Sequence, residues 1–258
     1  MYVVWEKIFN REFVNKFFTL SLGPDCHNNY IFQDEEKTKE AFSDAYWFKS
    51  GDVGTIDNDG FLKITGRIKE IIITEGGKNI APIPIESDIR DRLPNVISQA
   101  VVIGDKRKYL SCLLTLKVEI DPQTNFPTDN LDPVVIEWCK SILTKQNIVV
   151  EEKDIPATTM DFIKGRHAIF FEEGIQEVIN EVNANAAFRA AEVRTFHVLQ
   201  HEFSIATGEF GPTLKLKRHV VAEKYKHEID QMYQSPKIKD SLYEGRISPE
   251  VIYTKYTM

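Results

Sequence analysis

Glycines and prolines interrupt short apolar segments throughout residues 47–86, whose sequence is WFKSGDVGTIDNDGFLKITGRIKEIIITEGGKNIAPIPIE. Residues 61–64 and 71–73 have the apolar patterns of short strands, and Asp59-Gly60 has the composition of a hairpin turn. Chain breakers at such close intervals place polar side chains on loops that a sheet holds in place, where binding residues are common. The stretch therefore predicts a small sheet that carries a binding site.

Three long motifs occur in order along the chain, and the first lies within residues 47–86. They are GRIKEIIITEGGKNIAP from Gly66, VVIGDKRKYLSCLLTLK from Val101, and GEFGPTLKLKRHVVAEKYKHEID from Gly208. With WFKSGD before them, they resemble the AMP-forming acyl-CoA synthetases of the adenylate-forming enzyme superfamily. The resemblance is strongest to the bubblegum branch of long-chain fatty acid CoA ligases, and it extends from about residue 30 to the C-terminus.

Composition sets limits on the class of protein. The 258 residues suffice for one or two domains, and 42% apolar with 28% charged residues describes an ordinary soluble globular chain. The net charge of -7 argues against nucleic acid as the main partner. Cys26, Cys112 and Cys139 have no CxxC spacing, so they predict neither a disulfide framework nor a zinc site and indicate a reducing compartment.

The first residues of the chain have a helical period. Trp5, Phe9, Phe13 and Phe17 recur every four positions and predict an amphipathic helix with an aromatic stripe over residues 5–18. Packing of this stripe on the rest of the chain is the simpler interpretation. Binding to a membrane surface or a partner is the alternative.

No stretch of about 18 apolar residues predicts a transmembrane helix, and the N-terminus lacks the layout of a signal peptide. We therefore expect a cytoplasmic protein. Peripheral association with the endoplasmic reticulum membrane is the alternative location.

The resemblance implies an α/β (α+β) fold in two parts. Residues 1–68 would be a strand-rich remnant of the large N-terminal AMP-binding domain, and residues 69–258 the mobile C-terminal domain, a small β-sheet flanked by helices. No Ser/Thr/Gly-rich phosphate loop and no Walker-type motif occurs in the sequence, so we expect a fragment or truncated form. Periodicity predicts strands over residues 97–104 and 109–118, and helices over residues 131–143, 166–183 and 216–233.

Asp52 and Arg67 are the expected nucleotide-binding residues. A carboxylate can accept two hydrogen bonds from the adjacent hydroxyls of a ribose, and the resemblance assigns this role to Asp52. Arg67 offers a planar donor fork for a ribose oxygen or a phosphate. Without the resemblance, Asp52 would be read as a turn residue and Arg67 as part of a basic pair at a strand edge.

The resemblance assigns the next residues to domain rotation and thioester formation. Lys69 matches the hinge residue about which the C-terminal domain rotates between two catalytic poses. Gly76 and Gly77 match a loop that lines the pantetheine tunnel, where the missing Cβ atoms allow close approach. Lys78 stands where many members have Arg and would act near the active site as a point charge. An ordinary hairpin loop is the alternative.

Lys215 is the expected catalytic residue. Adenylation joins two anions, so a cation between the carboxylate oxygen and the α-phosphate stabilises the transition state. The Lys-x-x-Arg spacing of Lys215 and Arg218 fits the C-terminal lysine motif of the family. Leu214 replaces the glycine that usually precedes this lysine, which leaves Lys217 as a rival assignment.

The implied function is a long-chain fatty acid CoA ligase that uses ATP with Mg²⁺ and then CoA, in a chain that is inactive by itself. Fatty acid, ATP and CoA would be its small-molecule substrates. Two alternatives remain: a ligase for another carboxylic acid, and a non-catalytic binding protein that keeps the C-terminal fold. His197 and His201 are four residues apart but lie in a β-like run without the Glu of HExxH, so no metal site is expected.

Overall fold

The computed structural model describes residues 3–7, 18–22, 35–42, 48–56, 59, 61–148 and 150–234. These residues divide into two compact units. The first unit comprises residues 1–88 and 104–108, and the second comprises residues 89–103 and 109–258. A boundary at residue 69, as the resemblance implies, stays a prediction.

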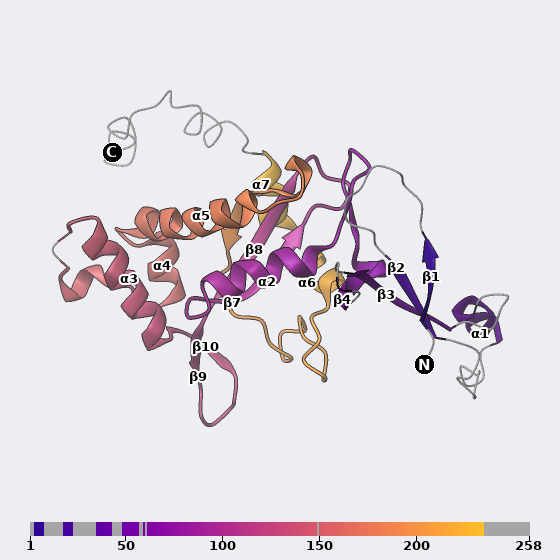
Figure 1. The fold of residues 1–258 in the computed structure, drawn as a ribbon. Helices are drawn as coiled ribbons and strands as arrows, with labels where there is room; N and C mark the ends of the chain where they lie inside the picture. The colour runs from indigo at the N-terminus through magenta and orange to yellow at the C-terminus, as the bar shows by residue number, and fades with distance from the viewer. Residues whose placement is uncertain are drawn as a thin grey trace. The chain divides into compact units, whose positions relative to one another are not determined.

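An antiparallel sheet in the order β1-β2-β3-β4 forms the framework of the first unit (Figure 1). Its strands are β1 (Val3–Lys7), β2 (Phe18–Leu22), β3 (Phe48–Ile56) and β4 (Leu62–Arg67). Strands β3 and β4 are paired from Ile56 opposite Leu62, on either side of Asp59-Gly60. The predicted hairpin is therefore confirmed.

The helix predicted over residues 5–18 is wrong where the structure describes it. Residues Val3–Lys7 are a strand paired with Phe18–Leu22, and β2 also pairs with β3. β-Branched and aromatic side chains suit a strand as well as a helix, and a neighbouring strand that supplies hydrogen-bond partners decides between the two. Residues 8–17 lie outside the described residues.

Shorter elements complete the first unit. They are α1 (Glu35–Ala41), the 3₁₀ turn η1 (Ile68–Glu70), the two-residue strands β5 (Ile72–Ile73) and β6 (Asn79–Ile80), and the first part of α2 (Pro82–Arg92). Strand β5 is shorter than the predicted Ile-rich strand because Ile71 is the C-cap of the η1 turn, where its N–H donates to the carbonyl of Ile68.

The second unit is built on a three-stranded sheet in the order β11-β8-β7. Strand β7 (Ile97–Ile103) pairs antiparallel with β8 (Leu110–Leu116), and β11 (Val193–Val198) pairs parallel with β8. Every residue of β8 is buried, as expected for a central strand of almost continuous apolar sequence. Both strands predicted from residues 97–118 are confirmed, and β9 (Val118–Ile120) continues the chain into a hairpin with β10 (Pro127–Leu131).

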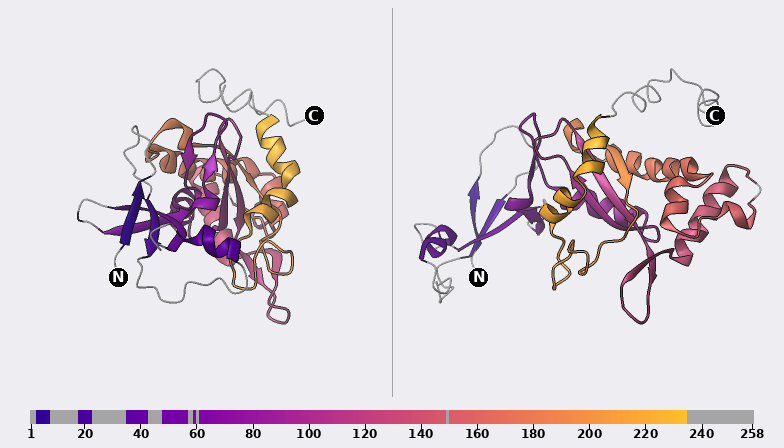
Figure 2. Two further views of the ribbon diagram at one scale, coloured as in Figure 1. Left: turned by 90° about the vertical axis from the view of Figure 1, so that its right-hand side faces the viewer. Right: turned by 180° about the vertical axis from the view of Figure 1, so that it is seen from behind.

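Helices cover both faces of this sheet. Figure 2 shows α5 (Ala168–Ala184) on one side of the strands and α7 (Lys226–Gln234) on the other. Helices α3 (Pro133–Lys145) and α4 (Thr159–Lys164) pack against α5 through the rings of Trp138, Phe162 and Phe171, of which Phe162 stacks on both others. The helices predicted over residues 131–143 and 166–183 are confirmed as α3 and α5. The 3₁₀ turns η2 (Glu152–Asp154) and η3 (Arg189–Ala191) connect these elements.

The helix predicted over residues 216–233 is divided into two. Helix α6 (Arg218–Lys224) ends before Tyr225, and α7 begins at Lys226. An apolar core joins both helices to the sheet, with Val221, Ile229 and Met232 packed on Val101 and Leu113. The break turns the Tyr225 side chain inward, where its hydroxyl donates to a buried carboxylate.

Candidate functional site

Asp52 and Arg67 lie directly opposite each other on paired strands. Strand register places Asp52 of β3 against Arg67 of β4. The Arg67 Nε atom lies 3.4 Å from the Asp52 Oδ1 atom, with the arginine side chain 61% exposed and the aspartate 29% exposed. The two residues expected to bind a nucleotide thus form one partly exposed pair, which offers a carboxylate acceptor beside a guanidinium donor.

Local geometry fixes this pair. Gly51 has a φ of 75°, a conformation that glycine adopts without strain, and the Asp52 N–H donates to the Ser50 hydroxyl at 3.1 Å. On the next strand, the buried Thr65 hydroxyl donates to the Val53 carbonyl at 3.2 Å. The register shifts between Val53 and Gly54, and such bulges commonly redirect side chains at the ends of strands.

Gly76, Gly77 and Lys78 form a tight, exposed loop between β5 and β6. Thr74 closes the loop, because its carbonyl accepts from Gly77 N at 2.8 Å and its hydroxyl accepts from Lys78 N at 3.1 Å. Gly77 has a φ of 72°, whereas Gly76 has no positive φ and open space around the position of a Cβ atom. The two glycines therefore contribute differently: Gly77 permits the turn, and Gly76 leaves room for a ligand to approach.

A second loop, residues 104–108, supports the glycine loop and was missed at the level of sequence. The Lys106 N–H donates to the Ile73 carbonyl at 2.8 Å, and the Glu75 N–H donates to the Arg107 carbonyl at 2.9 Å. The Asp105 carboxylate accepts from Ile73 N at 3.2 Å. The sequence predicted only the strands on either side of this loop, since nothing in the pattern indicated a partner about thirty residues earlier.

Lys69, the predicted hinge, is the central residue of the η1 turn and is exposed. The turn lies between β4 and β5, directly after Arg67. A single 3₁₀ turn with no buried side chain has little packing to hold its backbone angles. This weak packing suits a hinge, but Lys69 lies inside the first compact unit, and the rotation itself stays a prediction.

Lys215 belongs to the second unit and lies on an exposed loop. The loop is a small hairpin in which Phe210 and Leu216 form an antiparallel bridge and Gly211 N donates to the Lys215 carbonyl at 2.9 Å. Leu214 turns the chain with a φ of 57° while its side chain is 69% exposed. A positive φ at this position explains why glycine suits the residue before the lysine.

Lys217, the rival to Lys215, is the N-cap of α6 and is also exposed. Its backbone N–H donates to the Glu209 carbonyl at 2.7 Å, and no side-chain hydrogen bond caps the helix. A positive charge at a helix N-terminus is unfavourable. The described geometry leaves both lysines on the same hairpin and does not choose between them.

A buried glutamate behind this hairpin escaped sequence reasoning. The Glu209 side chain is 0% exposed and accepts hydrogen bonds from Lys224 Nζ at 2.5 Å, from the Tyr225 hydroxyl at 2.8 Å and from the Thr207 hydroxyl. Burial alone raises the pKa of Glu209, but the hydrogen bonds from Lys224, Thr207 and Tyr225 outweigh it and lower the pKa to about 2. The spacing Glu-x₁₄-Lys-Tyr gives no recognisable signal before the fold is known.

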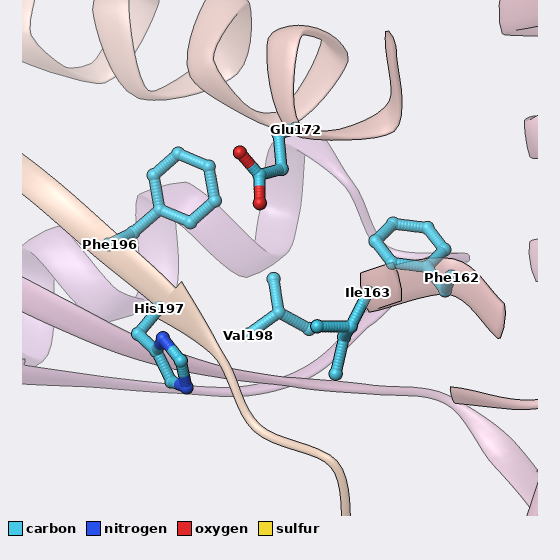
Figure 3. A pocket seen from close by; sticks show the side chains of 6 residues that line it. All are labelled: Phe162, Ile163, Glu172, Phe196, His197 and Val198. Atoms are coloured by element: carbon cyan, nitrogen blue, oxygen red, sulfur yellow. The ribbon is translucent and has the colours of Figure 1, made fainter. Parts of the chain in front are cut away.

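A small pocket lies elsewhere in the second unit, between α4, α5 and β11 (Figure 3). The side chain of Glu172 points from α5 toward Phe196 and Val198, whereas His197 points away on the other side of its strand. The cavity volume of about 60 Å³ is well below the several hundred Å³ of a typical ligand site. No residue predicted for the site lines this pocket.

The described residues contain no group of three or more His, Cys, Asp or Glu side chains placed to hold a metal ion. His197 lies on β11, as the β-like run predicted, and the His201 Nδ1 atom is 2.8 Å from the Asp129 carboxylate. Cys112 and Cys139 are both buried. Within the same described residues, we find no helix with the length and apolar character needed to cross a bilayer.

Comparison with known proteins relates the chain to one family. Residues 69–159 match the model of the AMP-binding enzyme C-terminal domain. The long-chain-fatty-acid–CoA ligase ACSBG1 of Rattus norvegicus is 46% identical over 79% of the chain and 26% of the relative. ACSBG2 of Xenopus laevis is 44% identical over 78% of the chain and 25% of the relative. The chain thus spans about a quarter of the length of the curated relatives it matches.

Solved structures share the fold at low sequence identity. The adenylation domain of a carboxylate reductase from Mycobacterium chelonae has a TM-score of 0.63 at 15% identity, covering 91% of this chain and 31% of that one. The corresponding domain from Segniliparus rugosus, solved with AMP and a carboxylic acid, has a TM-score of 0.57 at 16% identity over 90% of this chain and 32% of that one. Residues 69–159 therefore match the AMP-binding enzyme C-terminal domain, and the chain shares the fold of these adenylation domains.

Proposed function

We propose that this chain is the C-terminal part of a long-chain fatty acid CoA ligase. The overall reaction converts ATP, a fatty acid and CoA into acyl-CoA, AMP and pyrophosphate. The observation that supports this most directly is 46% identity to a long-chain-fatty-acid–CoA ligase over 79% of the chain. The lysines to which roles are assigned, Lys69, Lys78, Lys215 and Lys217, are all exposed, so substrates can reach them.

Lys215 would act in the first half-reaction. A carboxylate oxygen of the fatty acid attacks the α-phosphorus of ATP, the bond to the β-phosphate oxygen breaks, and pyrophosphate leaves. Negative charge accumulates on the phosphoryl oxygens as two anions meet, and the ammonium group of Lys215 would stabilise it. Mg²⁺ would enter with the phosphates of ATP, because Mg²⁺ is commonly bound through substrate phosphates and few carboxylates.

The first unit would bind the nucleotide and serve the second half-reaction. Asp52 would accept hydrogen bonds from the ribose hydroxyls, and Arg67 beside it would donate to a ribose oxygen or a phosphate. After rotation about Lys69, the loop of Gly76, Gly77 and Lys78 would line the path of CoA. The CoA thiolate would then attack the acyl carbon and AMP would leave.

A chimera tests this proposal. Residues 35–234 would replace the matching segment of rat ACSBG1, and pyrophosphate release would be measured with palmitate and ATP. Lys215→Ala should reduce release about a hundredfold or more, as for loss of a group that stabilises transition-state charge. Lys226→Ala, at an exposed lysine of α7, is the matched control and should have no such effect.

Lys217→Ala in the same chimera separates the two assignments. If Lys215 is the catalytic residue, Lys217→Ala should retain most of the activity. A large loss with Lys217→Ala alone would transfer the role to Lys217. Undiminished pyrophosphate release from both variants would contradict the proposed chemistry.

The chain by itself should not form acyl-adenylate, because its sequence has no match to the phosphate loop. The measurement is pyrophosphate release from the purified 258-residue chain with palmitate and ATP. We further propose a cytoplasmic location, with association at a membrane surface during delivery of the fatty acid. Flotation of the chain with liposomes tests that association.

A further inference from the structure

The side chain of Glu209 is the buried centre of a polar network. Its oxygens accept hydrogen bonds from Lys224 Nζ at 2.5 Å, the Tyr225 hydroxyl at 2.8 Å, the Thr207 hydroxyl and, more weakly, Ser204 N at 3.5 Å. A carboxylate with 0% exposure is costly unless it is paired and hydrogen-bonded, and here both conditions are met. The network therefore has one favoured geometry, and losing one donor leaves a buried charge with less compensation.

The backbone of Glu209 is tied to the hairpin that carries both candidate lysines. Its carbonyl accepts from Lys217 N at 2.7 Å. The next residue, Phe210, bridges to Leu216, and Gly211 N donates to the Lys215 carbonyl at 2.9 Å. A fixed Glu209 consequently fixes the backbone on both sides of the hairpin, including the two lysines.

Apolar packing contributes little at the tip of this hairpin. Residues 212–215 are all exposed, and Leu214 is 69% exposed with a φ of 57°. Lys224 adds a hydrogen bond to the Thr207 carbonyl at 3.3 Å, so it links the segment before Glu209 to helix α6. We propose that Glu209 is a positioning residue, whose buried carboxylate holds the lysine-bearing hairpin of residues 209–217 in place on α6.

Hydrogen exchange on the purified chain tests the positioning without any assay of activity. Glu209→Gln keeps the shape of the side chain and removes its charge. It should raise the exchange rates of the Gly211, Leu214 and Lys217 amides at least tenfold, while the amides of β8 exchange as before. Glu223→Gln on the exposed face of α6 is the control and should change none of them.

Tyr225→Phe is a milder second variant, for the case in which Glu209→Gln fails to fold. It removes one hydrogen bond to the carboxylate and keeps the aromatic ring that packs near Phe203. A rise in exchange confined to the hairpin supports the inference. Parental exchange in the hairpin, or equal rises in the hairpin and in β8, would overturn it.

The consequence for catalysis rests on the proposed function, and the two half-reactions of the chimera separate it from a general loss of structure. Glu209→Gln should slow pyrophosphate release from palmitate and ATP at least tenfold. Conversion of supplied palmitoyl-adenylate and CoA, which does not use Lys215, should stay unchanged. A merely structural role would reduce both rates equally. If the hairpin loosens and Lys215→Ala leaves pyrophosphate release intact, the proposed function fails while the positioning by Glu209 stands.

Discussion

Leu214 shows how one residue departs from the conformation its side chain prefers. With a φ of 57°, it occupies the left-handed region at about 1–2 kcal/mol for a residue other than glycine, and its side chain is 69% exposed. Leu214→Gly removes this strain, but glycine loses more conformational entropy on folding, which offsets part of the gain. The variant should therefore leave stability unchanged or raise it by up to about 1 kcal/mol. Leu214→Val should lower stability by about 1 kcal/mol, because a β-branched residue is least suited to positive φ.

Urea unfolding of the purified chain measures both changes. Leu214→Ala is the matched control, since it removes the exposed side chain and keeps a Cβ atom at the same φ. We expect it to differ little from the parent. Destabilisation by glycine together with tolerance of valine would show that the backbone angle is not what limits this position.

Gly76 and Gly77 can be distinguished in the same way. Gly77 has a φ of 72°, so Gly77→Ala should destabilise the loop by about 1 kcal/mol. Gly76 has an ordinary φ and nothing within 4 Å of an added Cβ atom, so Gly76→Ala should fold like the parent. In the chimera, Gly76→Ala should still slow thioester formation from palmitoyl-adenylate, since its Cβ atom enters the space left for CoA. Parental rates with Gly76→Ala would mean that CoA does not approach this residue.

The elements of the chain differ in how far the sequence could predict them. The sequence predicted four elements of the second unit, β7, β8, α3 and α5. Each strand is largely apolar along its length and each helix has a regular apolar period, so the pattern indicated which residues are buried. The aromatic period of the first residues was misleading. There the pairing of β1 with β2, and of β2 with β3, decides the structure, and pairing between distant segments is invisible to a local period.

Contacts between elements explain what the sequence missed in the candidate site. The motif singled out Asp52 and Arg67, but only the strand register shows that they are direct neighbours. The same holds for Glu209, which meets Lys224 and Tyr225 because helix α6 folds back over the hairpin. Single residues could be predicted from motifs, whereas their partners depend on the tertiary fold.

The network between the hairpin and α6 should make stability depend on acid. The pKa of Glu209 is about 2 in the folded protein, below its ordinary value of 4.5. The charged carboxylate therefore stabilises the fold fully above about pH 4.5. This contribution, on the order of 3 kcal/mol, should disappear as the pH falls from 4.5 toward 2. Urea unfolding at pH 6 and pH 3 should show a smaller loss of stability for Glu209→Gln than for the parent. Equal losses in the two proteins would exclude Glu209 as a source of the acid sensitivity.

At the scale of the whole molecule, the two groups of predicted residues belong to different units. Asp52, Arg67 and the glycine loop belong to the first unit, and Lys215 and Lys217 to the second. Rotation about Lys69, as proposed above, would instead move the glycine loop and Lys215 together, so the boundary between the two units does not coincide with the proposed hinge. A variant at Lys69 is therefore needed to test the hinge directly.

Lys69→Pro is the variant that tests rotation. Proline fixes φ near −65°, which is within the range of a 3₁₀ turn, and it is tolerated in the first turn of a helix, so the η1 geometry described here can be kept. If the backbone at Lys69 must change between the half-reactions, the chimera with Lys69→Pro should retain one of them and lose at least tenfold in the other. Lys69→Ala keeps the backbone free and serves as the control, with both rates near parental. Parental rates for both half-reactions in Lys69→Pro would place the hinge elsewhere in the chain. Equal losses in both half-reactions would indicate damage to the fold, which circular dichroism of the same variant would detect.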